Sequence, residues 1–331
     1  MGALGSAFLP SWLQARSILS QNPKLVKDRA VIFLFMHGGP SQFETFDPKM
    51  DAPAEIRSMT GEIPTRIPGI TFGSTFEKLA RLNDKFSIVR SFTTENGNHD
   101  SKPLVDSRHS SGAHIGSHYA KVAGSSHPRK GTPRNVILYP RAVEAEAMPA
   151  IMSLGKFNST GPLGSSLEPF APSGDGGLKE DLKIRLEADR LSDRRHLLGA
   201  VDQWKKTVDR LGEGGGLDHF HGQAFDTLLA GVADAFEISR EDPKLIERYD
   251  TSKLMDVSRI SKRWNNHERY RDHVNTLGKL LLLARRLAER GAGFISVTTN
   301  FVWDMHADKN NATMTEGMDY VGKPFDHAVS V

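Results

Sequence analysis

Three short segments of the chain concentrate side chains that can bind metal ions or act as acids, bases and nucleophiles. The first holds His37, Glu44 and Asp47, the second Glu95, His99, Asp100 and Ser101, and the third Asp304, His306 and Asp308. Carboxylate oxygens and neutral imidazole nitrogens suit zinc, manganese and magnesium. A serine hydroxyl beside such a metal is a candidate nucleophile. The three segments together indicate a metal-dependent site.

Each segment follows a stretch that the sequence predicts to be a β-strand. The first follows 29–36, a continuous apolar run typical of a central parallel strand buried on both faces. The second follows 86–92 and the third follows 293–298. Ligands of open α/β sheets collect at the carboxyl ends of the strands. We therefore expect the three segments to meet at one edge of a sheet.

Each residue taken alone also has a structural interpretation. His37 fits a hydrogen-bonded loop residue, Asp47 fits a turn cap before Pro48, and Arg90 fits a solvated residue at a strand end. Two other histidines lie at the start of a predicted helix: His219 and His221. Four more are interpreted as surface or hydrogen-bonding residues: His109, His114, His118 and His127. The metal interpretation depends on the convergence of the three segments.

The elements that must position these residues alternate between strands and helices at both ends of the chain. A helix is predicted over 76–82, a third strand over 134–138 and a Gly-, Pro- and Ser-rich loop over 156–178. A charged, helical insertion is predicted over about 180–290. It contains a strong helix over 277–288, which Gly291 ends. This pattern predicts an α/β fold, an α/β/α sandwich with a mostly parallel sheet.

The composition excludes several classes of protein. The 331 residues include 38% hydrophobic and 25% charged residues, as in a globular protein, and no cysteine, which excludes disulfides, thiolate metal sites and cysteine nucleophiles. The formal net charge is only +3 with acids and bases mixed, so no nucleic-acid partner is expected. Gly38-Gly39 lacks the further glycine of a dinucleotide-binding loop. No apolar stretch reaches the length of a stable membrane span.

The two ends of the sequence carry separate expectations. Residues 2–15 are small and apolar without charge, like the core of an export signal. We therefore interpret 1–28 as a signal-peptide remnant and lead-in. Residues 325–331 are interpreted as the opening turns of an unfinished helix. The sequence is accordingly expected to be truncated at both ends, with 29–331 forming an incomplete domain.

Several motifs carry a resemblance to a known family. They are the segment 33–49 (FLFMHGGPSQFETFDPK), its continuation 51–57, the block LARLNDKFSIVRSF at 79–92, Asn98-His99, LLLARRLAERGAGFISV at 281–297, and Trp303-Asp304-Met305-His306. The chain resembles the secreted bacterial family called domain of unknown function 1501. That family is grouped with the alkaline phosphatase and sulfatase superfamily. The resemblance implies an α/β/α sandwich with metal ions at the carboxyl ends of the strands. It also implies twin-arginine export to the periplasm or beyond.

The resemblance further implies roles for individual residues. The metal ligands would be Glu44, Asp47, His99, Asp100, Asp304 and His306. His37 stands where the superfamily has its first metal-binding acid, so Glu44 or Asp47 would replace that acid. Ser101 would be the nucleophile, because Asp100-Ser101 resembles the Asp-Ser of phosphatases. His37 and Arg90 would contact the substrate anion, and His99 is an alternative contact. The resemblance places Asp326 to Val329 at the start of a long helix and the remaining ligands beyond residue 331.

The function expected from these features is metal-dependent hydrolysis of sulfate or phosphate esters. The cofactor would be zinc, manganese, calcium or magnesium, and the substrate a small-molecule or polysaccharide ester. The alternative is a non-catalytic exported protein that binds, for example, sulfated polysaccharide on the same fold. A truncated inactive product is a third interpretation.

Overall fold

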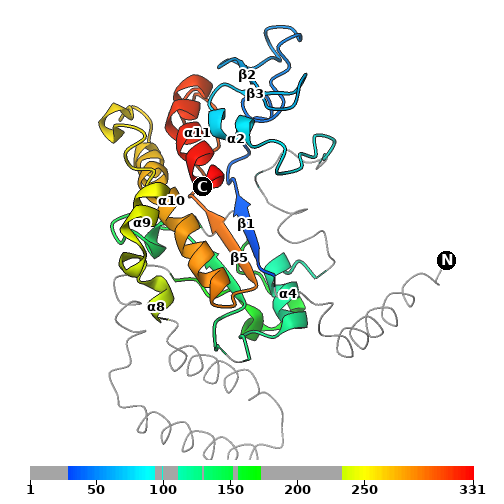
Figure 1. Ribbon diagram of the computed structural model, residues 1–331, viewed down its shortest axis with the longest axis vertical. Helices are drawn as coiled ribbons and strands as arrows, with labels where there is room; N and C mark the ends of the chain where they lie inside the picture. The colour runs from blue at the N-terminus through cyan, green and yellow to red at the C-terminus, as the bar shows by residue number, and fades with distance from the viewer. Residues whose placement is uncertain (1–28, 94–98, 100–110, 129, 152–155, 173–232) are drawn as a thin grey trace, which may run out of the picture. The chain divides into compact units, whose positions relative to one another are not determined.

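A parallel sheet organises the computed structural model, which describes residues 29–93, 99, 111–128, 130–151, 156–172 and 233–331. The chain divides into a short unit, Met1–Ala30, and a large unit, Val31–Val331, to which every element below belongs. Strand β5 (Phe294–Thr298) lies between β1 (Val31–Phe35) and β4 (Asn135–Leu138), and both neighbours run parallel to it (Figure 1). The strands predicted over 134–138 and 293–298 are confirmed.

Side chains alternate between the two faces of this sheet, as the pleat requires. One face packs against helix α10 (His267–Glu289) and contributes Leu34, Val136, Leu138, Ile295 and Val297 to a core with Leu280, Leu283 and Leu287. The other face contributes Phe33, Phe35, Ile137 and Tyr139, which surround Phe157. Helix α4 (Ile115–Ala123) covers β4 and β5, and Tyr119 contacts Phe294. The sheet is thus covered on both faces, and the α/β class is confirmed.

The remaining helices and strands lie around this centre. They are β2 (Glu62–Pro64) and β3 (Thr71–Gly73), which pair antiparallel, and α2 (Glu77–Arg81), α8 (Ala233–Phe236), α9 (Pro243–Tyr249) and α11 (Met314–Ser330). Helix α2 confirms the helix predicted over 76–82, and α10 confirms the one over 277–288 with Gly291 (φ 98°) after its end. Residues 1–28 and 173–232, where the export signal and much of the insertion are expected, lie outside the described residues. Within the described residues, no helix has the length and apolar character to span a bilayer.

Two strand predictions need correction. In the described part of the chain, β1 pairs with β5 alone, so it is an edge strand and not the central strand expected over 29–36. Its first residues, Val31 and Ile32, are exposed accordingly. The strand predicted over 86–92 is absent, because Phe86, Val89 and Phe92 are exposed and no neighbouring strand pairs with them in the described structure.

The interpretation of 325–331 as the opening turns of a helix was also wrong. Residues 325–330 belong to α11, a helix that already begins at Met314 and is capped by Thr313, whose hydroxyl accepts a hydrogen bond from the Glu316 amide at 3.3 Å. Asp326 therefore lies inside α11 and not at its start. Its carboxylate accepts hydrogen bonds from the amides of Lys78 and Leu79, at 2.9 and 2.8 Å, and so caps α2.

Candidate metal centre

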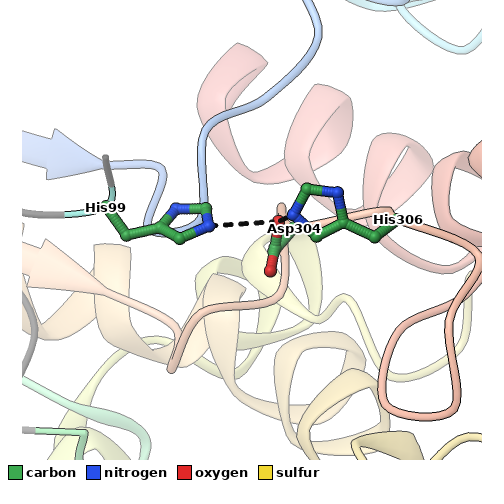
Figure 2. Close-up of side chains that lie close together, drawn as sticks. All are labelled: His99, Asp304 and His306. Atoms are coloured by element: carbon green, nitrogen blue, oxygen red, sulfur yellow. Dashed lines mark ion pairs between the residues drawn. The ribbon is translucent and has the colours of Figure 1, made fainter. Parts of the chain in front are cut away.

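Three side chains from two distant segments of the sequence converge just beyond β5. Figure 2 shows the Asp304 carboxylate between the rings of His99 and His306. Oδ1 of Asp304 lies 2.5 Å from Nε2 of His306 and 3.6 Å from Nε2 of His99. The three ligand atoms all lie within 4.8 Å of one another. Two imidazoles and one carboxylate form a donor set that suits zinc or manganese.

The turn after β5 places Asp304 at this position. Asn300 and Phe301 have positive φ values of 42° and 67°, so the chain bends sharply after the strand. The Trp303 amide then donates to the carbonyl of His37 at 3.1 Å, which ties this turn to the one after β1. The site therefore lies at the carboxyl ends of β1 and β5, the edge where ligands are expected.

A second set of contacts fixes the Asp304 carboxylate from behind. Its Oδ2 accepts a hydrogen bond from Nδ2 of Asn311 at 3.3 Å. Asn266, immediately before α10, in turn donates to Oδ1 of Asn311 at 2.7 Å. Asp308 accepts hydrogen bonds from the amides of Asn310 and Asn311, both at 2.7 Å, so its carboxylate shapes the loop. Such supporting hydrogen bonds orient metal ligands in known sites.

His99 and His306 are partly exposed to solvent, whereas Asp304 between them is buried. The Asp304 side chain is 8% exposed, whereas those of His99 and His306 are 36% and 58% exposed. The ring of His99 packs edge-on against Phe301, with ring centroids 4.7 Å apart. A metal held by these three ligands would keep a coordination position accessible to water or substrate, as in catalytic sites.

Burial controls the electrostatics of this region. It raises the pKa of Asp304 above its ordinary value, while His306 and His99 act in the opposite direction. A divalent cation would oppose the burial effect and favour the carboxylate. Burial lowers the pKa of His37 to about 4, and the charges of His99 and Arg269 contribute. His37 is therefore a neutral imidazole at pH 7.

Comparison with known proteins identifies the family. A family model described as "Protein of unknown function (DUF1501)" matches residues 28–330. The chain belongs to the DUF1501 family. The searches of curated proteins and of solved structures found no match. The family assignment confirms the family resemblance of the sequence motifs, and it names no activity.

Glu44 of this DUF1501 protein lies outside the cluster and has a different role. Its buried carboxylate accepts hydrogen bonds from Ser58 Oγ at 3.0 Å, Met59 N at 2.6 Å, Thr60 N at 3.2 Å and Thr60 Oγ1 at 2.6 Å. These four donors hold the loop 58–60 against the turn after β1. The carboxylate is thus occupied by the protein itself.

Asp47 and Arg90 contact each other instead of the cluster. Their charged groups lie 3.4 Å apart, and Asp47 also pairs with Lys49 at 3.0 Å. Arg90 donates a further hydrogen bond to the carbonyl of Phe46 at 2.6 Å. The sequence analysis predicted a metal ligand at Asp47 and a substrate-anion contact at Arg90, whereas the structure shows an ion pair between them. Asp100 and Ser101, expected as ligand and nucleophile, lie outside the described residues.

Arg269 is a residue near the site that the sequence analysis did not single out. It lies in the first turns of α10, and its charge contributes to the lowered pKa of His37. The signal in the sequence is its spacing, three residues after Asn266 and four before His273. Both of those residues contact the chain that follows β5.

Proposed function

We propose that this DUF1501 protein is a metal-dependent hydrolase of phosphate or sulfate esters. The observation that carries the proposal is the convergence of His99, Asp304 and His306 at the carboxyl edge of a parallel sheet. Three protein ligands with an exposed rim fit a catalytic site better than a closed structural one. A divalent metal at this position supplies positive charge for the ester oxygens as they become more negative in the transition state.

The protein's own residues have distinct parts in this proposal. Asp304, held by Asn311, would supply one metal ligand, and the partly exposed imidazoles of His99 and His306 would supply two others. His37 remains neutral beside them, because burial lowers the pKa of its imidazole to about 4. Ser101 is kept as the proposed nucleophile because it follows His99 by two residues in the sequence. The proposal also includes the alkaline phosphatase-like superfamily and a periplasmic or secreted location, which rest on the resemblance of the motifs.

An assay with chelator-treated protein tests this function. Turnover of 4-nitrophenyl phosphate and 4-nitrophenyl sulfate is measured with zinc, manganese, magnesium or calcium added back singly. We expect at least one metal to restore turnover. His306→Ala should abolish it, whereas His327→Ala, at a half-buried histidine on α11 outside the cluster, should retain it. Metal-independent turnover, or equal turnover in His306→Ala, would contradict the proposal.

A second candidate function is metal-dependent binding without catalysis. Glu44 and Asp47 are occupied elsewhere, so the described residues supply ligands for one metal and not for a pair. A single exposed metal suits recognition of a sulfated polysaccharide as well as catalysis. Metal-dependent retention on a sulfated polysaccharide resin, without ester turnover under any of the four metals, would favour this function.

A further inference from the structure

Arg269 lies in the first turns of α10, and its charge acts on His37. Three residues earlier, Asn266 bonds to Asn311, the residue that holds Asp304. Four residues later, the Nδ1 atom of His273 lies 2.8 Å from the hydroxyl of Thr299. Residues spaced by three and four share one face of a helix. Arg269 therefore faces the same segment, 299–311, from which Asp304 and His306 arise.

The guanidinium of Arg269 forms no ion pair in the described structure, although the charge of Asp272 acts on it from a greater distance. No described carboxylate lies within ion-pair distance, and its Nη1 atom is buried without a hydrogen-bond acceptor. Glu268, adjacent in the sequence, pairs with Arg271 at 3.8 Å. Asp272, three residues later, uses its carboxylate for the Met148 amide at 2.6 Å and for Arg271 at 3.1 Å. A buried donor without an acceptor costs free energy. An anionic ligand would remove this cost.

His37 gives a second, independent indication of a ligand. The residue is only 2% exposed, yet its Nε2 atom has no hydrogen-bond partner among the described residues. Its ring packs edge-on against Phe301, with centroids 4.9 Å apart, and the same Phe301 ring contacts His99. The unpartnered Nε2 atom of His37 therefore lies next to the candidate metal centre, with Phe301 between them, and the charge of Arg269 acts on this same imidazole.

We propose that Arg269 binds the oxyanion of the substrate, a tetrahedral phosphate or sulfate group, beside the buried imidazole of His37. The planar guanidinium presents paired N–H donors that match two oxygens of such a group. The metal centre would take a further oxygen of the same group. This inference rests on the proposed function, because it assigns the substrate anion to the same site.

Binding of inorganic phosphate and inorganic sulfate tests the inference directly. Each anion is titrated into the full chain by calorimetry, with the protein first free of metal and then loaded with zinc. We expect Arg269→Gln to weaken anion binding at least about 10-fold in both states, while zinc affinity changes less than about threefold. Arg269→Lys keeps the charge but loses the paired donors, so its anion affinity should lie between those of the parent protein and Arg269→Gln.

The control is Arg285→Gln, on the same helix, where the arginine is exposed and pairs with Glu289 at 2.8 Å. It should bind both anions like the parent protein. Circular dichroism checks that each variant is folded. If Arg269→Gln does not fold, Arg269→Lys replaces it in the anion titrations. The anion bound more tightly indicates whether phosphate or sulfate esters are the substrates.

The outcomes separate this inference from the proposed function. If zinc binds and Arg269→Gln binds anions as tightly as the parent, or if Arg285→Gln loses as much affinity, Arg269 is not the anion-binding residue. If zinc does not bind but phosphate binding is present and is lost in Arg269→Gln, the anion site stands and the metal-dependent hydrolase fails. If the parent protein binds neither anion in either state, the inference is overturned.

Discussion

Gly38 packs against Asp304 so closely that a Cβ atom on Gly38 would lie 2.5 Å from the Asp304 amide nitrogen. The turn after β1 thus contacts the backbone of Asp304, the central residue of the candidate metal centre. Gly38 also has a φ of 115°, a conformation that residues with a side chain rarely adopt. This contact joins the two strand ends that form the candidate site, and it explains why a glycine follows His37.

Gly38→Ala is expected to disturb the metal centre as well as the fold. Gly39 has a φ of 86°, but a Cβ there meets nothing within 4 Å, so Gly39→Ala provides the matched control. Backbone strain should cost each variant about 1 kcal/mol of unfolding free energy, and the contact with Asp304 should cost Gly38→Ala about 1–3 kcal/mol more. Denaturant unfolding and zinc titration measure both effects. Equal stability and equal zinc affinity of the two variants would refute the role of the contact.

Glu44→Gln tests whether this acid is structural. The amide replaces an oxygen that accepts hydrogen bonds with a group that donates them, so we expect a loss of about 2 kcal/mol in unfolding free energy. Zinc affinity should not change. Glu62→Gln is the control, because Glu62 is an exposed residue that accepts one hydrogen bond, from Thr71 at 2.7 Å. A large loss of zinc affinity in Glu44→Gln, with little loss of stability, would instead make Glu44 a ligand.

Buried histidines predict a loss of stability in acid. The Nε2 atom of His273 lies 3.2 Å from the carbonyl of Val321, so Nε2 carries the proton and Nδ1 accepts from the Thr299 hydroxyl. Burial lowers the pKa of His273 to about 4, against 6.5 in the unfolded chain. Burial likewise lowers the pKa of His114, whose Nδ1 atom accepts a hydrogen bond from the Gly116 amide, to about 4. Between pH 6.5 and 4 the unfolded chain binds more protons at these histidines than the folded chain does. Their contribution to the free energy of unfolding is therefore fully present above pH 6.5 and is lost as the pH falls toward 4.

Unfolding free energies measured by denaturant between pH 7 and 4.5 check this prediction. Each such histidine contributes at most about 1.4 kcal/mol per pH unit to the slope. His273→Gln, which can keep both hydrogen bonds, should reduce the slope, and adding His114→Gln should reduce it further. An unchanged slope in the double variant would show that these histidines do not set the acid sensitivity.

The sequence predicted the buried parts of this fold better than its edges. Residues 134–138 and 293–298 are short apolar runs, and burial on both faces of a sheet leaves them no other structure. The segment 86–92 has a similar apolar content, but pairing depends on a neighbouring strand, which local sequence does not contain. The start of α11 was placed too late in the sequence, because Gly317, Gly322 and Pro324 are typical helix breakers and tertiary packing outweighs their propensity.

The candidate site shows the same division. Asp304 and His306 lie in one loop after a correctly predicted strand, so sequence spacing located them. His99 joins them although the strand expected to carry it is absent. Glu44 and Asp47 have the residue types of ligands, but only the structure shows that their carboxylates are occupied by other partners. The position of Arg269 required knowing which face of α10 meets the loop after β5.

Zinc titration of the chelator-treated protein by calorimetry shows whether His99, Asp304 and His306 bind a metal ion. We expect about one zinc ion per chain and a rise in thermal stability with the logarithm of free zinc. Asp304→Asn should weaken zinc binding at least about 100-fold, because even outer-shell partners of a metal contribute 10–100-fold. Asp47→Asn, outside the cluster, should bind zinc like the parent. Absence of binding at millimolar zinc and manganese, or equal affinity in Asp304→Asn, would contradict the metal centre.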